Sequence, residues 1–505
     1  MIEAVHREPI SKVDTAWLRM EQPGNLMMIT GVIRFAEPLD YAGLLHAVEQ
    51  RFLLFPRFRQ KAVDRTTGAW WEPDPDFMLE HHVRRVSLPG KADRAELESL
   101  VADLASTPLD HARPLWQFHL VEHYLGGSAL VIRIHHCIAD GIALVQVFLS
   151  LTDPSREAGP VAARPKAWVR RRTREAAVFR RLLEPARDGF DFATHLAQRM
   201  LGEGMALLHE PARVGEYALG AREIVAELVN ALALPSDPRT RFKGRLGVRK
   251  TVAWAEPLPL AEVKAVGKAF GCTVNDVLIA CATGALRQYL LSCGETPESL
   301  ADIRATVPVN LRPLEHALAL GNHFGLVFLG LPLCCDNPLQ RLYTVHEEME
   351  QLKSSKQAAV TFGFLAALGL GPAALQKPVL DLLSEKASAV LTNVPGPQQA
   401  LYLAGAEIAE MMFWVPQNGT IGMGISILSY NGGVYFGLIS DYRLVPDPQE
   451  IIRHFQPEFE KLLWLGLMLP QEGPPEPAHA QTLLQHAVED LEGAARDRDS
   501  PSRRV

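Results

Sequence analysis

Apolar and polar positions form their clearest pattern between residues 129 and 149. An apolar, largely β-branched run over 130–134 predicts a buried strand, which ends at the sequence HHCIADG, residues 135–141. Apolar residues return at helical spacing at Ile142, Val145 and Leu149, so a helix is expected to follow directly. Two histidines and an aspartate therefore stand where a buried strand reaches a loop, a place where catalytic groups are often held.

The same patterns predict alternating helices and strands upstream. The expected elements are a short helix after Asp14, a strand over 27–35, a helix over 41–55, a strand-like run at 81–83, a helix over 95–105 and a strand over 117–124. Residues 125–128, LGGS, predict a hairpin between the last of these strands and the strand before His135. His81 and His82 are interpreted as structural, because neither an acid nor a glycine turn follows them.

The second half of the chain repeats this mixture. Its expected elements are strands over 250–256, 305–312, 326–333, 390–397, 425–430 and 434–439, and helices over 260–270, 273–290 and 448–467. Asn431-Gly432 between the last two strands is a strong hairpin signal. Thr273 has the chemistry of a helix N-cap, and Asp276 follows at the spacing of a capping box. This spacing explains the presence of Asp276 as a capping residue. No comparable structural role explains Asn275.

Length and composition indicate a globular protein of two domains. The chain has 505 residues, 48% of them hydrophobic and 22% charged, which is too long for one ordinary core and too apolar for a disordered chain. We expect an N-terminal domain over 1–163, a basic helical connection over 164–240, a C-terminal domain over 241–470 and a flexible tail over 471–505. The net charge of −7 gives no reason to expect nucleic acid as a partner.

Several features bear on the cellular compartment. The six cysteines show no disulfide framework, which fits a reducing cytosol, and residues 1–10 lack the apolar core of a signal peptide. The longest apolar stretch, 358–375, is interrupted by glycines and a proline, so a buried or membrane-surface helix is expected rather than a span. Residues 164–187 carry nine basic and two acidic residues, with Trp168 and Phe179 among them. That segment is interpreted either as a solvated linker helix or as a contact with anionic lipid.

The HHCIADG sequence suits general-base catalysis better than metal binding. Imidazole has an unperturbed pKa close to neutrality, whereas a metal would need further ligands, and the chain has no HExxH or CxxC sequence. A serine hydrolase is not indicated, because no GxSxG occurs and Ser426 stands within an expected strand. A nucleotide-phosphate site is not indicated either, since neither a Walker loop nor GxGxxG is present.

A series of short sequences, spread in order over roughly residues 8 to 465, resembles the bacterial wax ester synthase/diacylglycerol acyltransferase family. The matching sequences are PLW (114–116), HHCIADG (135–141), TVNDV (273–277), PVNLR (308–312), GN (321–322), NVPGP (393–397) and SYNGGVYFGLISD (429–441). The resemblance covers neither the basic connection nor the tail. It implies an α/β (α+β) fold similar to chloramphenicol acetyltransferase and peptide-synthetase condensation domains, in which two sandwich subdomains form a V around a central substrate tunnel.

The activity that this resemblance implies is transfer of a long-chain acyl group from acyl-coenzyme A to a fatty alcohol or a diacylglycerol, giving wax ester or triacylglycerol. Acyl-coenzyme A would be a substrate, with no permanently bound cofactor and no metal. An acyltransferase with another alcohol acceptor, or a catalytically inactive lipid-binding protein of the same fold, stays open as an alternative. Such substrates imply an enzyme at the inner face of the membrane or on lipid droplets, on the cytoplasmic side that the cysteine usage indicates. The sequence leaves open whether the enzyme is a monomer or a homodimer.

The resemblance also implies the residue that acts as the base. His136 is the expected general base, and strand alternation puts it on one face with Ile132 and Ile134, while His135 lies on the other. A thioester is already activated, so a base that deprotonates the acceptor hydroxyl suffices without an acyl-enzyme. Asn275, from the second domain, is the candidate donor of a hydrogen bond to the oxyanion.

The other residues of the matching sequences are expected to support the site. In related acyltransferases the aspartate of this motif pairs with an arginine, so Asp140 is expected to support the loop, with Arg57 as the first candidate partner and Arg59 and Arg312 left open. Cys137 is expected to be a small buried apolar residue rather than a nucleophile. Further residues expected to belong to the site or to position structure and substrate are His135, Gly141, Pro114, Leu115, Trp116 and Asp276.

Overall fold

The computed structural model describes residues 7–65, 68–157, 234–311, 320–355 and 381–468, together with Gln357, Ala358, Thr361, Pro477, Thr482 and Leu483. The basic segment 164–187, most of the apolar stretch 358–375, Arg312 and most of the tail beyond 470 lie outside these residues. The expectations for those segments therefore stay predictions.

Residues 7–157 alternate helices with the strands of two sheets. The elements are β1 (Glu8–Pro9), α1 (Lys12–Met20), β2 (Met28–Phe35), α2 (Tyr41–Gln50), β3 (Gln60–Arg65), β4 (Gly68–Pro73), β5 (Val83–Val86), α3 (Arg94–Ser106), β6 (Trp116–Tyr124), β7 (Gly127–His135) and α4 (Gly141–Leu151). Each helix begins at a polar side chain that accepts a hydrogen bond from a backbone amide of the first turn. These caps are Ser11, Asp40, Asp93 and Asp140.

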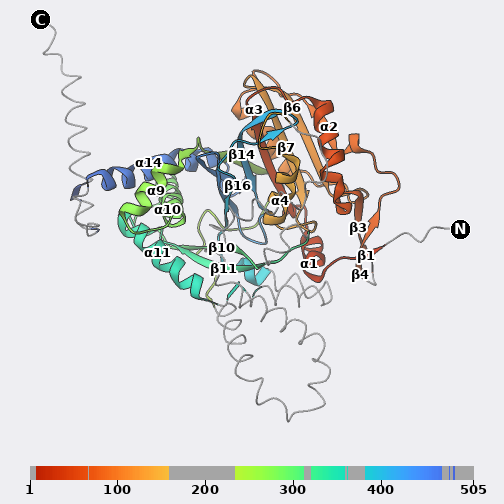
Figure 1. The fold of residues 1–505 in the computed structure, drawn as a ribbon. Coiled ribbons are helices and arrows are strands. Elements are labelled where there is room, and N and C mark those ends of the chain that lie inside the picture. The colour runs from red at the N-terminus through yellow and green to blue at the C-terminus, as the bar shows by residue number, and fades with distance from the viewer. Residues whose placement is uncertain are drawn as a thin grey trace, which may run out of the picture.

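The second half supplies a larger sheet and four long helices. Its elements are β8 (Lys250–Trp254), β9 (Leu258–Pro259), α9 (Leu260–Ala269), α10 (Val274–Ser292), β10 (Ile303–Asn310), β11 (Phe324–Leu331), α11 (Pro338–Ser354), β12 (Ala389–Pro395), β13 (Tyr402–Leu403), β14 (Ala406–Trp414), β15 (Met423–Tyr430), β16 (Gly433–Asp441) and α14 (Pro448–Met468). The helices α9, α10, α11 and α14 gather on one side of the molecule (Figure 1). The capping box of Thr273 and Asp276 at the start of α10 is confirmed.

Two of the expected elements differ in the structure. The helix expected over 41–55 ends at Gln50, and the chain continues through two 3-10 turns, Phe52–Leu54 and Pro56–Arg59. Proline restricts the residue before it and removes a backbone donor, so a continuous helix is not favoured at this point. The run expected to be strand-like at 81–83 is instead divided, because His81 ends a 3-10 turn and β5 begins at Val83.

The strands form three sheets. A six-stranded sheet has the order β13-β14-β2-β7-β6-β5, a seven-stranded sheet has the order β11-β10-β12-β15-β16-β8 with β9 beside β16, and a small sheet has the order β1-β4-β3. Both expected hairpins are confirmed, β6 with β7 and β15 with β16. Their turns hold residues of positive φ, which are Leu125 (49°) and Gly126 (82°) in the first and Asn431 (45°) and Gly432 (79°) in the second.

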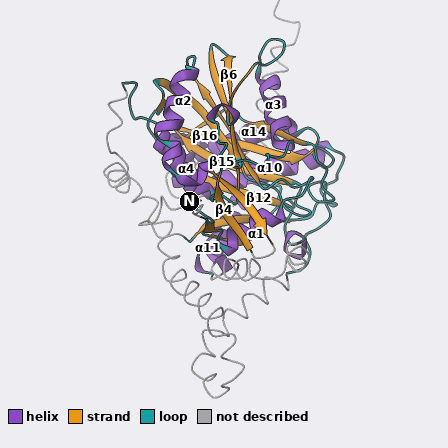
Figure 2. Cartoon of the chain, turned by 90° about the vertical axis from the view of Figure 1, so that its right-hand side faces the viewer, coloured by secondary structure: helices purple, strands orange, loops and turns teal. Residues whose placement is uncertain are grey.

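One pair of strands crosses between the halves. β14 pairs antiparallel with β2, with Phe413 opposite Gly31 and Trp414 opposite Thr30. β14, which is blue in Figure 1 and orange with the other strands in Figure 2, therefore lies with the strands of the first half. A Cβ at Gly31 would stand 2.4 Å from the ring of Phe413, and glycine therefore permits this close pairing. Residues 402–414, from the expected C-terminal domain over 241–470, thus complete the sheet of the first half.

The helices of the second half bury their apolar faces in the protein. Most of α10 is buried, including its Thr283 and Arg287. No single helix among the described residues is both long and apolar enough to cross a membrane. Within the described part of the chain, α9 and α10 taken together have the length and composition of a span, and they meet at a bend of 98°.

Candidate active site

His136 lies directly after β7, with its ring in the interior. Its backbone amide donates to the carbonyl of Met27 (2.7 Å), which fixes the chain at the end of the strand. The ring stacks on Trp17, with centroids 4.4 Å apart, and lies near Phe324. Burial lowers the pKa of His136 to about 4, and the Asp140 carboxylate opposes this shift. The imidazole is therefore neutral at neutral pH, and a lone pair is available on one ring nitrogen.

His135 points to the opposite side of β7, as strand alternation predicts. Its Nε2 lies 2.8 Å from a carboxylate oxygen of Glu21, and its Nδ1 accepts a hydrogen bond from the amide of Cys137 (3.1 Å). Since Nδ1 accepts, the proton of the neutral ring is on Nε2 and is donated to Glu21. Burial works to raise the pKa of Glu21, but hydrogen bonds from His111 and His135 hold that pKa at about 2. His135 is thus a fixed support for the strand end.

Cys137 has no catalytic character. Its side chain is fully buried, and burial raises the pKa of the thiol well above its ordinary value. A thiolate is the reactive form of cysteine, so this residue behaves as a small apolar side chain. The structure agrees with the expectation for it.

Asp140 holds the loop by accepting backbone hydrogen bonds. Its Oδ1 accepts from the amide of Ala143 (2.9 Å) as the N-cap of α4, and its Oδ2 accepts from the amide of His323 (3.0 Å). The expected partner Arg57 is wrong, because its guanidinium binds Glu8 (3.2 Å) and lies over the ring of Trp71. The 3-10 turn Pro56–Arg59 places Arg57 close enough to Asp14 and Cys137 to interact with them electrostatically, but its hydrogen-bond partner is Glu8 on β1 of the small sheet.

The loop of residues 321–323, from the second half, closes over the HHCIADG loop. The side-chain amide of Asn322 donates to the carbonyl of His136 (2.7 Å) and to Oδ1 of Asp14 (2.7 Å). The amide of Gly321 donates to the carbonyl of Ile138 (3.1 Å). Asn322 and Asp14 are both buried, and burial raises the pKa of Asp14. Sequence reasoning missed both roles, although Gly321-Asn322 belongs to the matching series.

A cavity lies between the two halves and reaches His136. It has about 1140 Å³ of space that protein atoms do not fill, part of which is open to solvent. Apolar side chains from both halves make most of its wall, among them Ile132, Ile134, Leu144, Phe148, Phe413 and Leu428. The polar residues of the wall are His136, Asp140, Asn310, Thr392, Asn393 and Ser426.

Gly141 also lines this cavity, as the first residue of α4. A Cβ at this position would meet no heavy atom within 4 Å. A side chain at this position would therefore extend into open space of the cavity, and the φ of Gly141 is not in the left-handed region.

Asn275 does not line the cavity, but its side chain contacts a residue that does. It stands in the first turn of α10, and its side-chain oxygen accepts a hydrogen bond from the amide of Asn393. Asn393 on β12 lines the cavity, whereas Asn275 does not. The second half thus presents two side-chain amides to the cavity, those of Asn310 and Asn393, and Asn275 contacts the second of them.

The PLW sequence supports the strand that ends at the histidines. The carbonyl of Leu115 accepts from the amide of His135 (2.9 Å), and that of Pro114 accepts from the amide of Trp116 (2.9 Å). The indole of Trp116 is fully buried and donates to the carbonyl of Phe58 (2.8 Å). None of the three lines the cavity, so their role is structural.

Asp276 lies outside the cavity, at the buried start of α10. Its Oδ2 accepts from the amide of Thr273 (2.8 Å) and lies 2.7 Å from Nδ1 of His346. Together with Cys272, these residues form the one group within the described part of the chain whose donor atoms are close enough to hold a metal ion. No local spacing predicts it, because His346 comes from α11, far along the chain.

A buried neutral histidine on a long apolar cavity between two α/β lobes defines an acyltransferase-type site for a hydrophobic substrate. A family model for the wax ester synthase/diacylglycerol acyltransferase catalytic domain matches residues 10–278, and the model for the C-terminal domain of this family matches residues 320–463. The chain therefore belongs to the wax ester synthase/diacylglycerol acyltransferase family. It is an acyltransferase that uses acyl-coenzyme A.

Individual relatives agree with this assignment. A putative diacylglycerol O-acyltransferase of Mycobacterium tuberculosis is 29% identical over 481 residues, covering 90% of each chain. A probable diacylglycerol O-acyltransferase of the same organism is 29% identical over 432 residues, covering 84% of this chain and 88% of the relative.

Solved structures confirm the predicted two-lobed fold. The wax ester synthase/diacylglycerol acyltransferase from Marinobacter aquaeolei VT8 superposes with a TM-score of 0.63 at 23% identity, covering 91% of this chain and all of that one (100%). The first condensation domain of the calcium-dependent antibiotic synthetase gives a TM-score of 0.58 at 16% identity, covering 94% and 98% of the two chains.

Proposed function

We propose that this enzyme transfers a long-chain acyl group directly from acyl-coenzyme A to the hydroxyl of a fatty alcohol or a diacylglycerol, with His136 as the general base. The observation that carries the proposal is the position of His136, a neutral imidazole on the wall of a large apolar cavity. Apolar walls from both halves suit the alkyl chains of both substrates, and the histidine is among the few polar groups beside them.

The histidine takes and then returns one proton. The acceptor hydroxyl gives its proton to the free ring nitrogen of His136 as its oxygen attacks the thioester carbonyl. The tetrahedral intermediate then collapses, the carbon–sulfur bond breaks, and the imidazolium returns the proton to the leaving thiolate of coenzyme A. The Asp140 carboxylate, which raises the pKa of His136, stabilises the imidazolium between the two steps.

The negative charge on the carbonyl oxygen needs a neutral donor. The amide pair of Asn393 and Asn275 is our candidate, because Asn393 lines the cavity and Asn275 holds its side chain. Removing one donor of this kind typically lowers the rate by about 10²–10³. Asn275, the asparagine of the TVNDV sequence, thus acts by holding the side chain of Asn393 on β12.

The enzyme forms no acyl-enzyme in this mechanism. The Cys137 thiol is buried with a raised pKa, and the Ser426 hydroxyl, which lies in the cavity wall, is hydrogen-bonded to Thr392 (3.3 Å) rather than to a base. Neither residue is activated as a nucleophile. A thioester needs no such intermediate, because it is already reactive toward an alkoxide.

We further propose that the enzyme works in the cytoplasm, at the inner face of the membrane or on lipid droplets, as a monomer or homodimer and without a metal in catalysis. Substrates with long alkyl chains gather at such surfaces, and the basic segment 164–187 has the composition of a contact with anionic lipid.

The experiment that tests the mechanism measures release of coenzyme A thiol from palmitoyl-coenzyme A. It is run with hexadecanol, with dioleoylglycerol and without acceptor, for the wild type and for His136→Ala. We expect release that depends on an acceptor and falls by at least about 10²-fold in the variant, the usual range for a general base. An unaltered rate in His136→Ala would refute the mechanism, and no acceptor dependence would favour the inactive lipid-binding alternative.

A further inference from the structure

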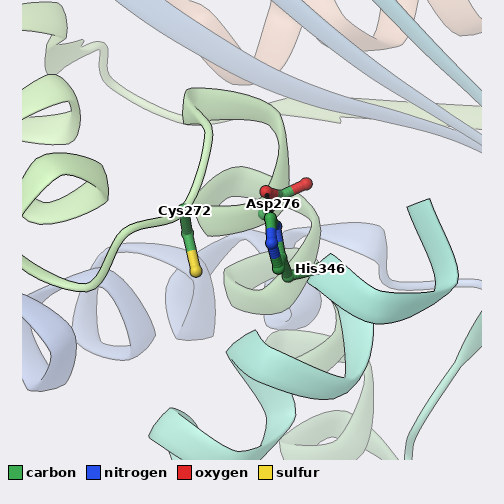
Figure 3. A group of neighbouring side chains, drawn as sticks. All are labelled: Cys272, Asp276 and His346. Carbon is green, nitrogen blue, oxygen red and sulfur yellow. Dashed lines mark hydrogen bonds and ion pairs between the residues drawn. The ribbon is translucent and has the colours of Figure 1, made fainter. Parts of the chain in front are cut away.

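A cluster of three potential metal ligands lies at the start of α10, outside the cavity. Cys272 comes from the loop before the helix, Asp276 from its first turn and His346 from α11 (Figure 3). One donor atom from each side chain lies within 4.8 Å of the other two. Sulfur, carboxylate oxygen and imidazole nitrogen together are a donor set that zinc accepts.

One oxygen of the buried Asp276 carboxylate has no hydrogen-bond partner among the described residues. Its side chain is fully buried, and its ion-pair partner is His346, which is charged only when protonated. Its Oδ2 accepts hydrogen bonds, but its Oδ1 is buried without a hydrogen-bond partner within the described part of the chain. Buried carboxylates in proteins are normally paired with a cation, fully hydrogen-bonded or bound to a metal.

We propose that Cys272, Asp276 and His346 bind one zinc ion, with water in the fourth position. Binding displaces the thiol proton of Cys272 into solvent and moves the proton of the neutral His346 ring from Nδ1 to Nε2, so that Nδ1 is free to coordinate. The ion supplies the positive charge that the buried carboxylate lacks. Because the thiol must lose its proton to bind the metal, zinc affinity rises with pH.

The site has a structural connection to the cavity. Asn275 immediately precedes Asp276 in α10 and holds Asn393, which lines the cavity. A metal at Asp276 would therefore fix the helix start from which the amide pair is positioned. The proposal concerns metal binding alone, and its test does not depend on the catalytic role of either asparagine.

The test uses the full-length protein after treatment with a chelator, titrated with Co²⁺ as a spectroscopic probe and then with Zn²⁺. We expect one cobalt per chain, with a near-ultraviolet absorption band from thiolate to cobalt that Zn²⁺ abolishes. The band should be lost in Cys272→Ser and should need at least about tenfold more cobalt in His346→Gln. Circular dichroism of each variant shows whether it is folded.

Cys293→Ser is the matched control. Cys293 is a half-buried free cysteine at the other end of the same helix, so its replacement changes one thiol without touching the cluster. The band should be unchanged in this variant. Absence of a thiolate band in the wild type, or a band that persists in folded Cys272→Ser, would show that the cluster is a hydrogen-bonded group without a metal and would overturn the proposal.

Discussion

Asn322 should be needed to position His136, although it does not line the cavity. Its side-chain amide donates to the carbonyl of His136 and to the carboxylate of Asp14, each at 2.7 Å. Asn322→Ala removes a hydrogen bond to a charged group, worth about 1.5–3 kcal/mol, and one to a neutral carbonyl, worth about 0.5–1.5 kcal/mol. The free energy of unfolding should therefore fall by about 2–4.5 kcal/mol.

The same change should act on catalysis through the geometry of the base. Without Asn322 the backbone at His136 can shift, and a misplacement of about 1 Å can cost about 10²-fold in rate. We expect kcat for coenzyme A release to fall about 10- to 100-fold while KM changes little, because the cavity wall is intact. Urea unfolding and steady-state kinetics on one preparation measure both effects.

Two further variants separate positioning from general destabilisation. Asn337→Ala removes a buried asparagine that caps α11, with two backbone hydrogen bonds of 3.0 Å, so it should lower stability and leave kcat unchanged. Asn322→Asp places a carboxylate against Asp14, whose pKa burial already raises, so its loss of stability should be smaller at pH 5 than at pH 8. If Asn322→Ala is destabilised but retains the kcat of the wild type, our account of its role is wrong.

Other measurements test other parts of the structure. Because burial lowers the pKa of His136 to about 4, kcat/KM should stay constant through the neutral range and decline only toward that pH; a decline centred near 6.5 would show an exposed imidazole. The unfolded chain protonates this histidine first, at its ordinary pKa, so its contribution to stability should be complete above about pH 6.5 and be lost as the pH falls toward 4. Asn393→Ala and Asn275→Ala should each lower kcat by about 10²–10³. The kcat of the double variant should be little lower than that of either single variant, because Asn275 acts through Asn393. Additive losses would show that the two residues act independently. Replacing the three arginines at 170–172 by glutamine should weaken co-sedimentation with anionic vesicles and spare turnover of a detergent-dispersed acceptor, and unchanged co-sedimentation would exclude a lipid contact there.

Local patterns predicted the elements well because their causes are local. The turn at Leu125-Gly126 and the capping box of Thr273 depend on neighbours within four residues, and these are visible in one sequence. The separation of His135 from His136 follows from the period of a strand. Each of these predictions therefore agreed with the structure to within a few residues.

Local sequence patterns could not predict contacts between segments that are distant in the chain. Nothing near Asn322 indicates that its side chain reaches Asp14, and nothing near Arg57 shows that a 3-10 turn directs it to Glu8. The direction of Asn275 depends on where β12 lies, which is a property of the sheet. The family motif drew attention to Asn275, but only the structure shows that its contact Asn393 lines the cavity.

The pairing of β14 with β2 affects both the synthesis of the protein and the connection between its two lobes. Synthesis of the first half alone leaves β2 as an open edge of eight residues, which invites pairing with other chains until the second half emerges. The backbone hydrogen bonds between β14 and β2 also tie the two lobes together along this edge. Any separation of the lobes that keeps this pairing must therefore occur elsewhere along the cavity wall.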